Sequence, residues 1–118
     1  MAGVEKRVKP LLVKDPETGE EYTLEFSRES VKFAEQRKFN LSELTNFPAT
    51  NIPALWFYAF RKNHRDVARE KTDRLLENLG GLTAAELERL VILYNQPVAS
   101  LVITDPSERK NSKITVEL

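Results

Sequence analysis

The chain has 118 residues, and 18 Lys and Arg residues balance 18 Asp and Glu residues, so its formal net charge is zero. The length fits one domain with its own core, and 41% hydrophobic with 31% charged residues is typical of a folded protein. A neutral chain disfavours a general polyanion binder. Because there is no cysteine, disulfides, thiol catalysis and thiolate metal sites are excluded.

No part of the sequence has the hydrophobic length of a membrane span. The longest apolar runs fall well short of about 18 residues, and residues 1–30 lack the apolar run of a signal peptide. The lack of cysteine suits a reducing compartment. We therefore expect a cytoplasmic protein with no membrane partner.

The N-terminal part predicts a β-hairpin over residues 8–26. Pro10 lies in the first apolar run and indicates an edge position or a strand start, since it cannot donate a ladder hydrogen bond. Pro16 and Gly19 supply the conformations of a tight turn. Residues 21–26 then alternate polar and apolar side chains, which is typical of a half-buried strand.

A helical body is predicted over residues 28–102. Ser27 fits the N-cap of a helix over residues 28–38, and a further short turn of helix follows at 40–44. Residues 48–53 are interpreted as a linker that places its last proline in the first turn of the next helix.

The next helix is apolar nearly all round. Five of its residues share one stripe at helical spacing, and two further aromatics lie on other faces: Ile52, Leu55, Trp56, Ala59 and Phe60, then Phe57 and Tyr58. Such a helix is central in a domain or covered by a partner.

A charged helix and a leucine-rich helix complete the predicted body. Residues 61–79 form the charged helix, with Leu75, Leu76 and Leu79 inward, and Gly80-Gly81 ends it. Thr83 and Glu86 form a capping box that opens a helix with Leu87, Leu90, Val91 and Tyr94 on one stripe. Pro97 breaks or kinks this helix and could restart a short one through Val102.

The end of the sequence allows two interpretations. Ile114, Val116 and Leu118 alternate with polar residues, so residues 113–118 could be a short terminal strand, or residues 107–118 could be a tail ordered only by a partner. The whole sequence therefore predicts a single domain over residues 1–118, mainly α in an α+β class. Its hairpin precedes a bundle of about four to five helices.

Catalytic, cofactor and metal motifs are missing from the sequence, which predicts no enzyme, no cofactor and no metal. The single histidine, His64, has Asp66 at i, i+2, and such neighbours do not face each other on a helix. We interpret His64 as solvated or capping. The four glycines form neither a P-loop nor a dinucleotide fingerprint.

The basic run over residues 61–74 is the best candidate for nucleic-acid binding. It holds six cations and three anions, and the pairs Arg69/Asp73 and Glu70/Arg74 have i, i+4 spacing. Because these anions and the neutral chain weaken attraction to phosphates, we interpret the run as a solvated helix face, and nucleic acid is not the expected partner.

Two segments resemble a known family. Residues 22–31 (YTLEFSRESV) and 55–64 (LWFYAFRKNH) resemble the tail assembly chaperones of long-tailed, siphovirus-like bacteriophages and prophages. The resemblance covers roughly residues 20–95. It implies a non-enzymatic factor in the bacterial host cytoplasm that coats the tape measure protein, recruits tail tube subunits and self-associates. It also implies that the protein is absent from the finished virion.

The sequence offers candidate partner-binding residues for that role. Trp56, Phe57 and Phe60 could dock an apolar client, since five consecutive apolar side chains cannot all face one core. Three cations, Arg61, Lys62 and Arg65, could steer acidic clients. If residues 114–118 form a strand, it could add to the hairpin edge of a neighbour, although Pro10 would blunt one edge.

Two other functions remain open. One is a small DNA-binding regulator of a mobile element, which needs a compact basic recognition helix. The other is a minor structural or completion protein that stays in the phage particle.

Overall fold

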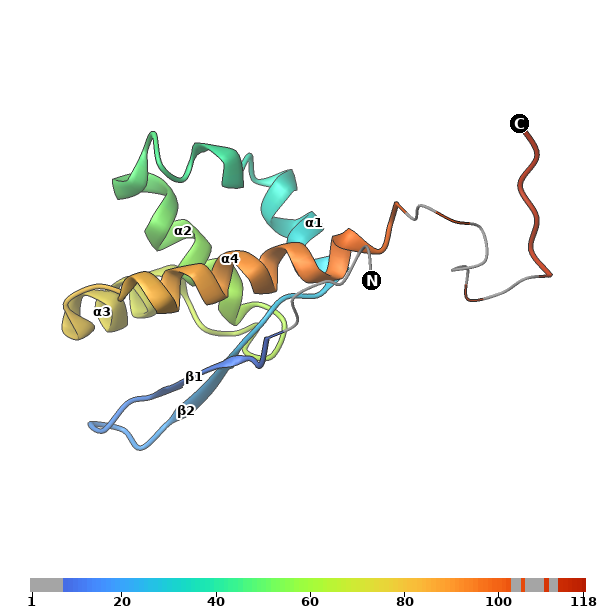
Figure 1. Cartoon of the computed structure of the whole chain (residues 1–118). Coiled ribbons are helices and arrows are strands. Elements are labelled where there is room, and N and C mark those ends of the chain that lie inside the picture. Colours follow the sequence, from blue (N-terminus) through green and yellow to red (C-terminus); the bar gives the residue numbers. More distant parts are fainter. Residues whose placement is uncertain (1–7, 103–104, 106–109, 111–112) are drawn as a thin grey trace.

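Two strands and four α-helices follow one another in the computed structural model, which describes residues 8–102, 105, 110 and 113–118. The elements are β1 (Leu11–Lys14), β2 (Glu21–Leu24), α1 (Arg28–Gln36), the 3-10 turn η1 (Leu41–Glu43), α2 (Pro48–Phe60), α3 (Arg69–Leu79) and α4 (Ala84–Ala99). Figure 1 shows the hairpin below the helices. This arrangement confirms the predicted α+β class, with an N-terminal hairpin followed by helices.

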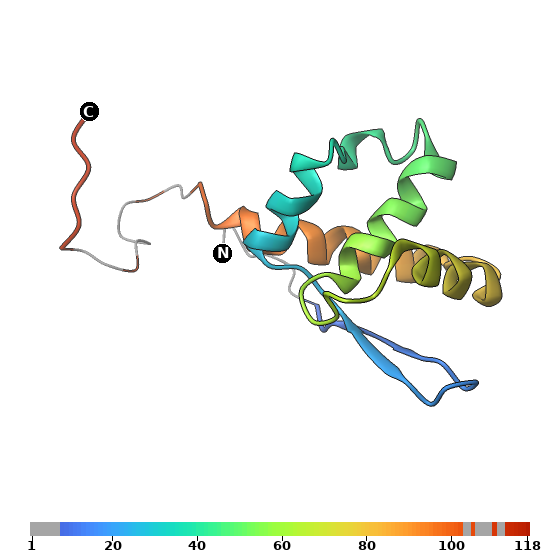
Figure 2. The same cartoon turned by 180° about the vertical axis from the view of Figure 1, so that it is seen from behind.

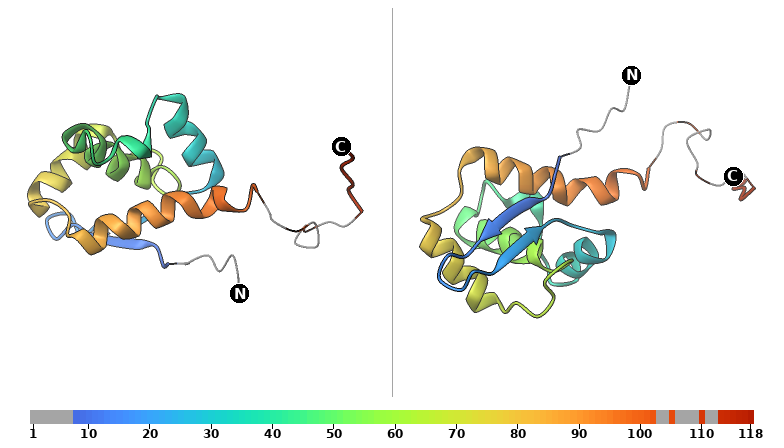
Figure 3. Two further views of the ribbon diagram at one scale, coloured as in Figure 1. Left: turned by 45° about the horizontal axis from the view of Figure 1, so that its top comes forward. Right: turned by 90° about the horizontal axis from the view of Figure 1, so that it is seen from below.

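The hairpin is shorter than the predicted span of residues 8–26, and one of its faces is buried. The strands are antiparallel, with Leu11 opposite Leu24 and Val13 opposite Tyr22. Tyr22 and Leu24 are buried against the helices, whereas Leu12 is exposed on the outer face. Seen from below, the two strands lie across the helical layer (Figure 3, right).

The predicted linker at residues 48–53 is wrong, because α2 already begins at Pro48. Pro48 suits the first turn, where its missing N–H needs no partner. Pro53 lies inside the helix and has no N–H, so the Ala49 carbonyl lacks its usual helical hydrogen bond. Ala49 lies in the exposed first turn of α2, where water can replace the missing partner, and the helix continues.

Helix α2 is the centre of the core. It packs against α1, α3, α4 and β2, so nearly all of its faces are covered. Leu55, Trp56 and Phe60 are fully buried, and the Trp56 indole N–H donates to the Thr72 carbonyl at 2.7 Å. This confirms the expectation of a central helix.

The predicted charged helix begins later than expected. Residues 61–68 form turns, and α3 starts only at Arg69. In the turns, the His64 Nε2 accepts the Thr23 N–H at 2.9 Å and the Asn63 amide donates to the Thr23 carbonyl at 3.0 Å. The Glu25 N–H donates to the Ala59 carbonyl at 3.2 Å. The outer edge of β2 is therefore closed by α2 and the turn after it, which a continuous helix would not allow.

His64 is thus a strand-edge acceptor and not a solvated side chain. We expect His64→Ala to lower the free energy of unfolding by about 1–2 kcal/mol, because the half-buried Thr23 N–H loses its partner. Urea denaturation followed by circular dichroism measures the effect. Asp66→Ala, at an exposed neighbouring position, serves as the control; equal losses in the two variants would refute this role.

The end of α3 and the start of α4 are determined by their own local residues. Gly80 ends α3 in the left-handed conformation at φ 78°. The Thr83 side chain accepts from the Glu86 N–H, and the Glu86 carboxylate accepts from the Thr83 N–H. These features confirm the predicted stop and capping box. Leu79, predicted to face inward, is 55% exposed.

The C-terminal end of α4 is held by a residue far away in the sequence. Pro97 lies inside α4, which continues to Ala99, so the predicted break at Pro97 is wrong. The Arg28 guanidinium donates to the Pro97 carbonyl at 2.8 Å and to the Ser100 hydroxyl at 2.7 Å. A cation at this end of a helix also complements the helix dipole.

Residues 113–118 contain neither helix nor strand, so the terminal strand is not formed in this structure. They lie apart from the helices in both views (Figures 1 and 2). Ile114 is 64% exposed and Val116 65% exposed. The other residues of the predicted tail, 107–112, lie outside the described residues except for Lys110. That a partner orders this tail stays a prediction.

Candidate functional site

A hollow of about 490 Å³ lies between α1 and the turn that follows α2. We call it the basic groove. One side is lined by Ser27, Glu29, Ser30, Lys32, Phe33 and Gln36, and the other by Arg61, Lys62 and Arg65. The structure therefore brings the three predicted basic residues to one site, next to a lysine and an aromatic ring of α1.

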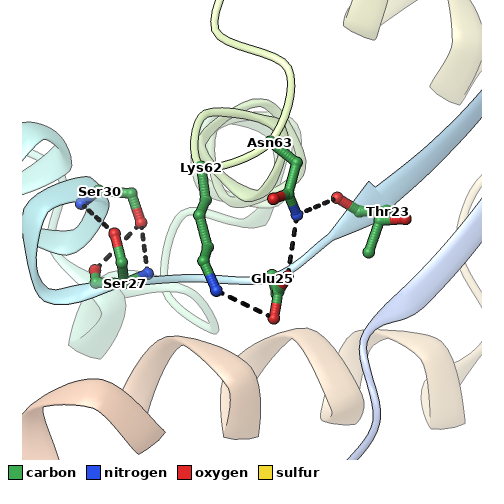
Figure 4. A network of polar contacts seen from close by, with 6 residues as sticks. All are labelled: Thr23, Glu25, Ser27, Ser30, Lys62 and Asn63. Carbon is green, nitrogen blue, oxygen red and sulfur yellow. Dashed lines mark hydrogen bonds and ion pairs between the residues drawn. The ribbon is translucent and has the colours of Figure 1, made fainter.

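The α1 wall is fixed by its own N-cap. The Ser27 hydroxyl accepts the Ser30 N–H at 3.1 Å, and the Ser30 hydroxyl oxygen accepts the Ser27 N–H at 2.8 Å (Figure 4). Val31 and Ala34 are buried against the core. Because these residues hold one face of the helix inward, Lys32 is left on the groove side.

The aromatic ring of the groove lies between two guanidinium groups. The Arg37 guanidinium carbon is 3.5 Å from the centroid of the Phe33 ring, and that of Arg61 is 3.8 Å from it. Cation–π stacking uses the flat face of a guanidinium. Its N–H groups point outward in the plane and stay available to carboxylates. Phe33 therefore positions Arg61 as a donor.

Lys62 is neutralised by Glu25. The Lys62 ammonium nitrogen is 3.3 Å from the Glu25 carboxylate, which also accepts from the Asn63 amide at 2.9 Å (Figure 4). The Asn63 hydrogen bond, aided by Lys62, holds the pKa of Glu25 below its usual value, although burial opposes the shift. This network ties the turn to β2, and it makes Lys62 a weaker steering group than predicted.

Three cations remain to give the groove its charge. Within the described part of the chain, no ion pair reaches Lys32, Arg61 or Arg65. Glu29 is the one carboxylate in the lining. The groove is therefore net positive on a chain of zero net charge, which suits an anionic partner group.

The aromatic candidates Trp56, Phe57 and Phe60 do not line the basic groove. Trp56 is 0% exposed and Phe60 is 1% exposed, so the expectation that they present a docking surface is wrong. Both are covered on all sides because α2 is central. Phe57 is half-buried, and its ring lies 5.6 Å from the Arg69 guanidinium. It shares a small hollow of about 20 Å³ with Arg61 and Arg65, so its role in binding stays a prediction.

Lys32 and Phe33 are residues of the site that the sequence did not predict. One signal was present: Phe33 lies off the stripe set by Val31 and Ala34, since a residue two positions after Val31 points to the opposite side of a helix. The approach of Phe33 to Arg61 is a tertiary contact between α1 and the end of α2, which no local pattern contains.

The side chains of the groove are suited to binding anionic groups. Its cations can donate to carboxylates, while its two serine hydroxyls are used in the α1 cap. His64, the single titratable imidazole, is engaged with β2. Among the described residues, no three His, Asp or Glu side chains are grouped as metal ligands, and no helix has the length and apolar character to cross a membrane.

Comparisons with known proteins place the chain in a family. No curated protein and no solved structure matches it. One family model, described as a domain of unknown function (DUF5055), matches residues 3–118 and so covers almost the whole chain. The chain belongs to the DUF5055 family.

Proposed function

We propose that this chain is a non-enzymatic phage or prophage tail assembly chaperone whose basic groove binds an acidic segment of the tape measure protein. It recruits tail tube subunits to that client in the cytoplasm of the bacterial host and leaves before the virion is complete. The observation that carries the proposal is the groove in which Lys32, Arg61 and Arg65 face one opening.

The groove supports a protein client through its mixed chemistry. The Arg61 guanidinium is held 3.8 Å from the centre of the Phe33 ring, so it loses little freedom when it binds a carboxylate. Lys32 and Arg65 are exposed beside it and attract acidic side chains from a distance. The faces of the half-buried Phe33 ring are covered by Arg37 and Arg61, so its edge adds only a small apolar contact. An acidic, amphipathic helix of a client combines the groups that match the groove: carboxylates for its cations and apolar side chains for the edge of Phe33.

The resemblance supports the same role. In the segment over residues 55–64, the apolar part is the buried half of α2, and its basic end lines the groove. The segment that resembles tail assembly chaperones therefore contains both the apolar residues that hold α2 in the core and the basic residues that line the candidate site.

The structure favours this proposal over a DNA-binding regulator. The basic run is divided between turns at residues 61–68 and helix α3, so it forms no single recognition helix. Arg69 is paired with Asp73 at 3.0 Å, and Lys62 is paired with Glu25. Local neutralisation of these cations weakens contact with phosphates.

Charge reversal in the groove tests the proposal. We expect the Lys32→Glu/Arg65→Glu variant to recover about tenfold less tape measure protein than the unaltered chain, because two attractive charges become repulsive. The tagged protein is isolated from a host that makes the full tail gene set, with nuclease added, and co-purifying chains are quantified by mass spectrometry.

Arg74→Glu/Arg89→Glu is the matched control, since it makes the same charge change at exposed positions outside the groove. Equal losses in the two variants, or no tape measure protein with the unaltered chain, would contradict the proposal. Salt-sensitive DNA binding without nuclease would favour the regulator. Recovery of the chain in purified virions would favour a completion protein.

A further inference from the structure

The two edges of the hairpin differ in what they can bind. The outer edge of β2 is closed, since the Thr23 N–H and carbonyl are both taken by His64 and Asn63. Thr23 lies opposite Leu12 in the ladder. Because Thr23 directs both groups away from β1, the pair is non-hydrogen-bonded, and the Leu12 N–H and carbonyl point away from β2. Lys14, two residues on, has the same orientation.

The outer edge of β1 therefore presents two donors and two acceptors. No hydrogen bond from the described residues reaches the backbone of Leu12 or Lys14 on that side. Open edges of this kind accept further strands. We call this side of β1 the open edge; Pro10, which was expected to blunt an edge, precedes β1 and leaves Leu12 and Lys14 unblocked.

Apolar side chains gather beside the open edge. Two adjoining hollows of about 130 Å³ and 430 Å³ lie between β1 and the ends of α3 and α4. Their apolar lining includes Leu11, Val13, Leu75, Leu79 and Leu82. Leu12 is 76% exposed at the same edge. Single exposed leucines are ordinary on a surface, but a cluster next to an unpaired edge marks a docking surface.

Residues 114–118 have the pattern that this surface requires. When they are extended, Ile114, Val116 and Leu118 project to one side, and Thr115 and Glu117 project to the other. The three apolar side chains are exposed in this structure. A segment with one apolar face and one polar face fits a strand that covers an apolar hollow and leaves its other face in water.

We propose that residues 114–118 of one copy of this chain add to the open edge of a second copy as a third strand. The side chains of Ile114, Val116 and Leu118 enter the apolar hollows, and Thr115 and Glu117 stay in water on the side of Leu12. The backbone of the added strand satisfies the outward N–H and carbonyl groups of Leu12 and Lys14.

The position of the segment favours a second copy. Residues 113–118 lie beyond the C-terminal end of α4 in all views, whereas Leu82 and Glu86 place the hollow at the N-terminal end of α4 (Figures 1 and 3). Reciprocal exchange would give a closed dimer, and one-way exchange an open chain. This inference does not depend on client binding, since the basic groove lies at the turn that closes β2 and leaves the open edge free.

Sedimentation of the full chain tests the interaction. We expect association that depends on protein concentration, and a dissociation constant raised about tenfold or more by Val116→Asp, which would bring a carboxylate into the apolar hollow. Thr115→Asp is the matched control, one residue away on the polar side, and should leave association nearly unchanged. Both positions are exposed in the single chain, so neither change threatens folding. A monomer at all concentrations, or equal effects of the two variants, would overturn the proposal.

Cysteine cross-linking identifies the contact, because the chain has no cysteine of its own. An equimolar mixture of Leu12→Cys and Thr115→Cys should form a disulfide between the two different chains on mild oxidation. A mixture of Lys32→Cys and Thr115→Cys, with the first cysteine on α1, should not. If the Leu12→Cys/Thr115→Cys double variant forms its disulfide within one chain and stays monomeric, the segment binds its own edge and the proposal is wrong.

Discussion

Trp56→Ala is expected to lower the free energy of unfolding by about 3–5 kcal/mol, the usual range for removing a large aromatic from a core. The side chain is fully buried, and its ring centroid lies 5.3 Å from that of Phe60. Truncation leaves a cavity at the centre of α2. It also leaves the Thr72 carbonyl without the indole N–H. Urea denaturation followed by far-ultraviolet circular dichroism measures the loss without using tryptophan fluorescence.

Two variants separate core packing from docking at this helix. Trp56→Phe keeps much of the apolar volume and should cost less than Trp56→Ala. Phe57→Ala, at the adjacent half-buried position, should cost about 1–2 kcal/mol. If Trp56→Ala folds with unchanged stability but fails to bind a client, Trp56 is a docking residue and not a core residue.

Stability should also fall at alkaline pH through Tyr94. The Tyr94 ring is buried, with its centroid 5.1 Å from that of Phe26 and 5.5 Å from that of Phe39. Burial, with smaller contributions from Glu35 and Tyr58, raises the pKa of Tyr94 to about 12. The folded state therefore favours the neutral phenol.

Because the pKa of Tyr94 is raised in the folded state, its contribution to stability decreases as pH rises. In the unfolded chain the phenol ionises at its ordinary pKa of 10.0, so the stabilising contribution is complete below about pH 10. It is lost as pH rises through the folded pKa of about 12. We expect a loss on the order of 2 kcal/mol in the free energy of unfolding across this window.

Tyr94→Phe is the control for that pH dependence, because it keeps the ring and removes the ionisable group. All other ionisable groups are the same in both proteins, so the difference between the two unfolding curves isolates Tyr94. The same decline with pH in both proteins would show that Tyr94 does not contribute.

Local features of the fold could be predicted because neighbours in sequence determine them. Ser27 and Thr83 each cap a helix through a bond to a residue three positions later. Gly80 tolerates the left-handed conformation that ends α3. The period of two in residues 21–24 and the apolar character of α2 likewise depend only on the local sequence.

The wrong predictions concern segments whose structure depends on contacts with residues distant in the sequence. Helix α2 starts at Pro48 because the rest of it is held in the core, although two prolines suggest a linker. The turn at residues 61–68 replaces a helix because Asn63 and His64 bind Thr23, about 40 positions earlier. Propensity carries no information on either contact.

The candidate site was predicted in part. The charge of Arg61 and Arg65 is visible in the sequence, and both residues line the basic groove. Lys32 and Phe33 lie beside them only because α1 packs next to α2, and Trp56 cannot bind a client because the elements around α2 bury it. Charge at a helix end could be identified from the sequence, but which aromatics stay exposed depended on the packing of the whole domain.

Site-specific photo-cross-linking shows whether the basic groove contacts a tail protein. Gln36 is an exposed residue of the groove lining, so a benzoylphenylalanine at that position would label whatever occupies the groove. The same group at Arg89, exposed on α4, is the control. In a host that makes the full tail gene set, we expect an adduct with the tape measure protein at position 36 and none at position 89. No tape measure adduct at position 36, or equal labelling at the two positions, would mean that the groove is not the binding site.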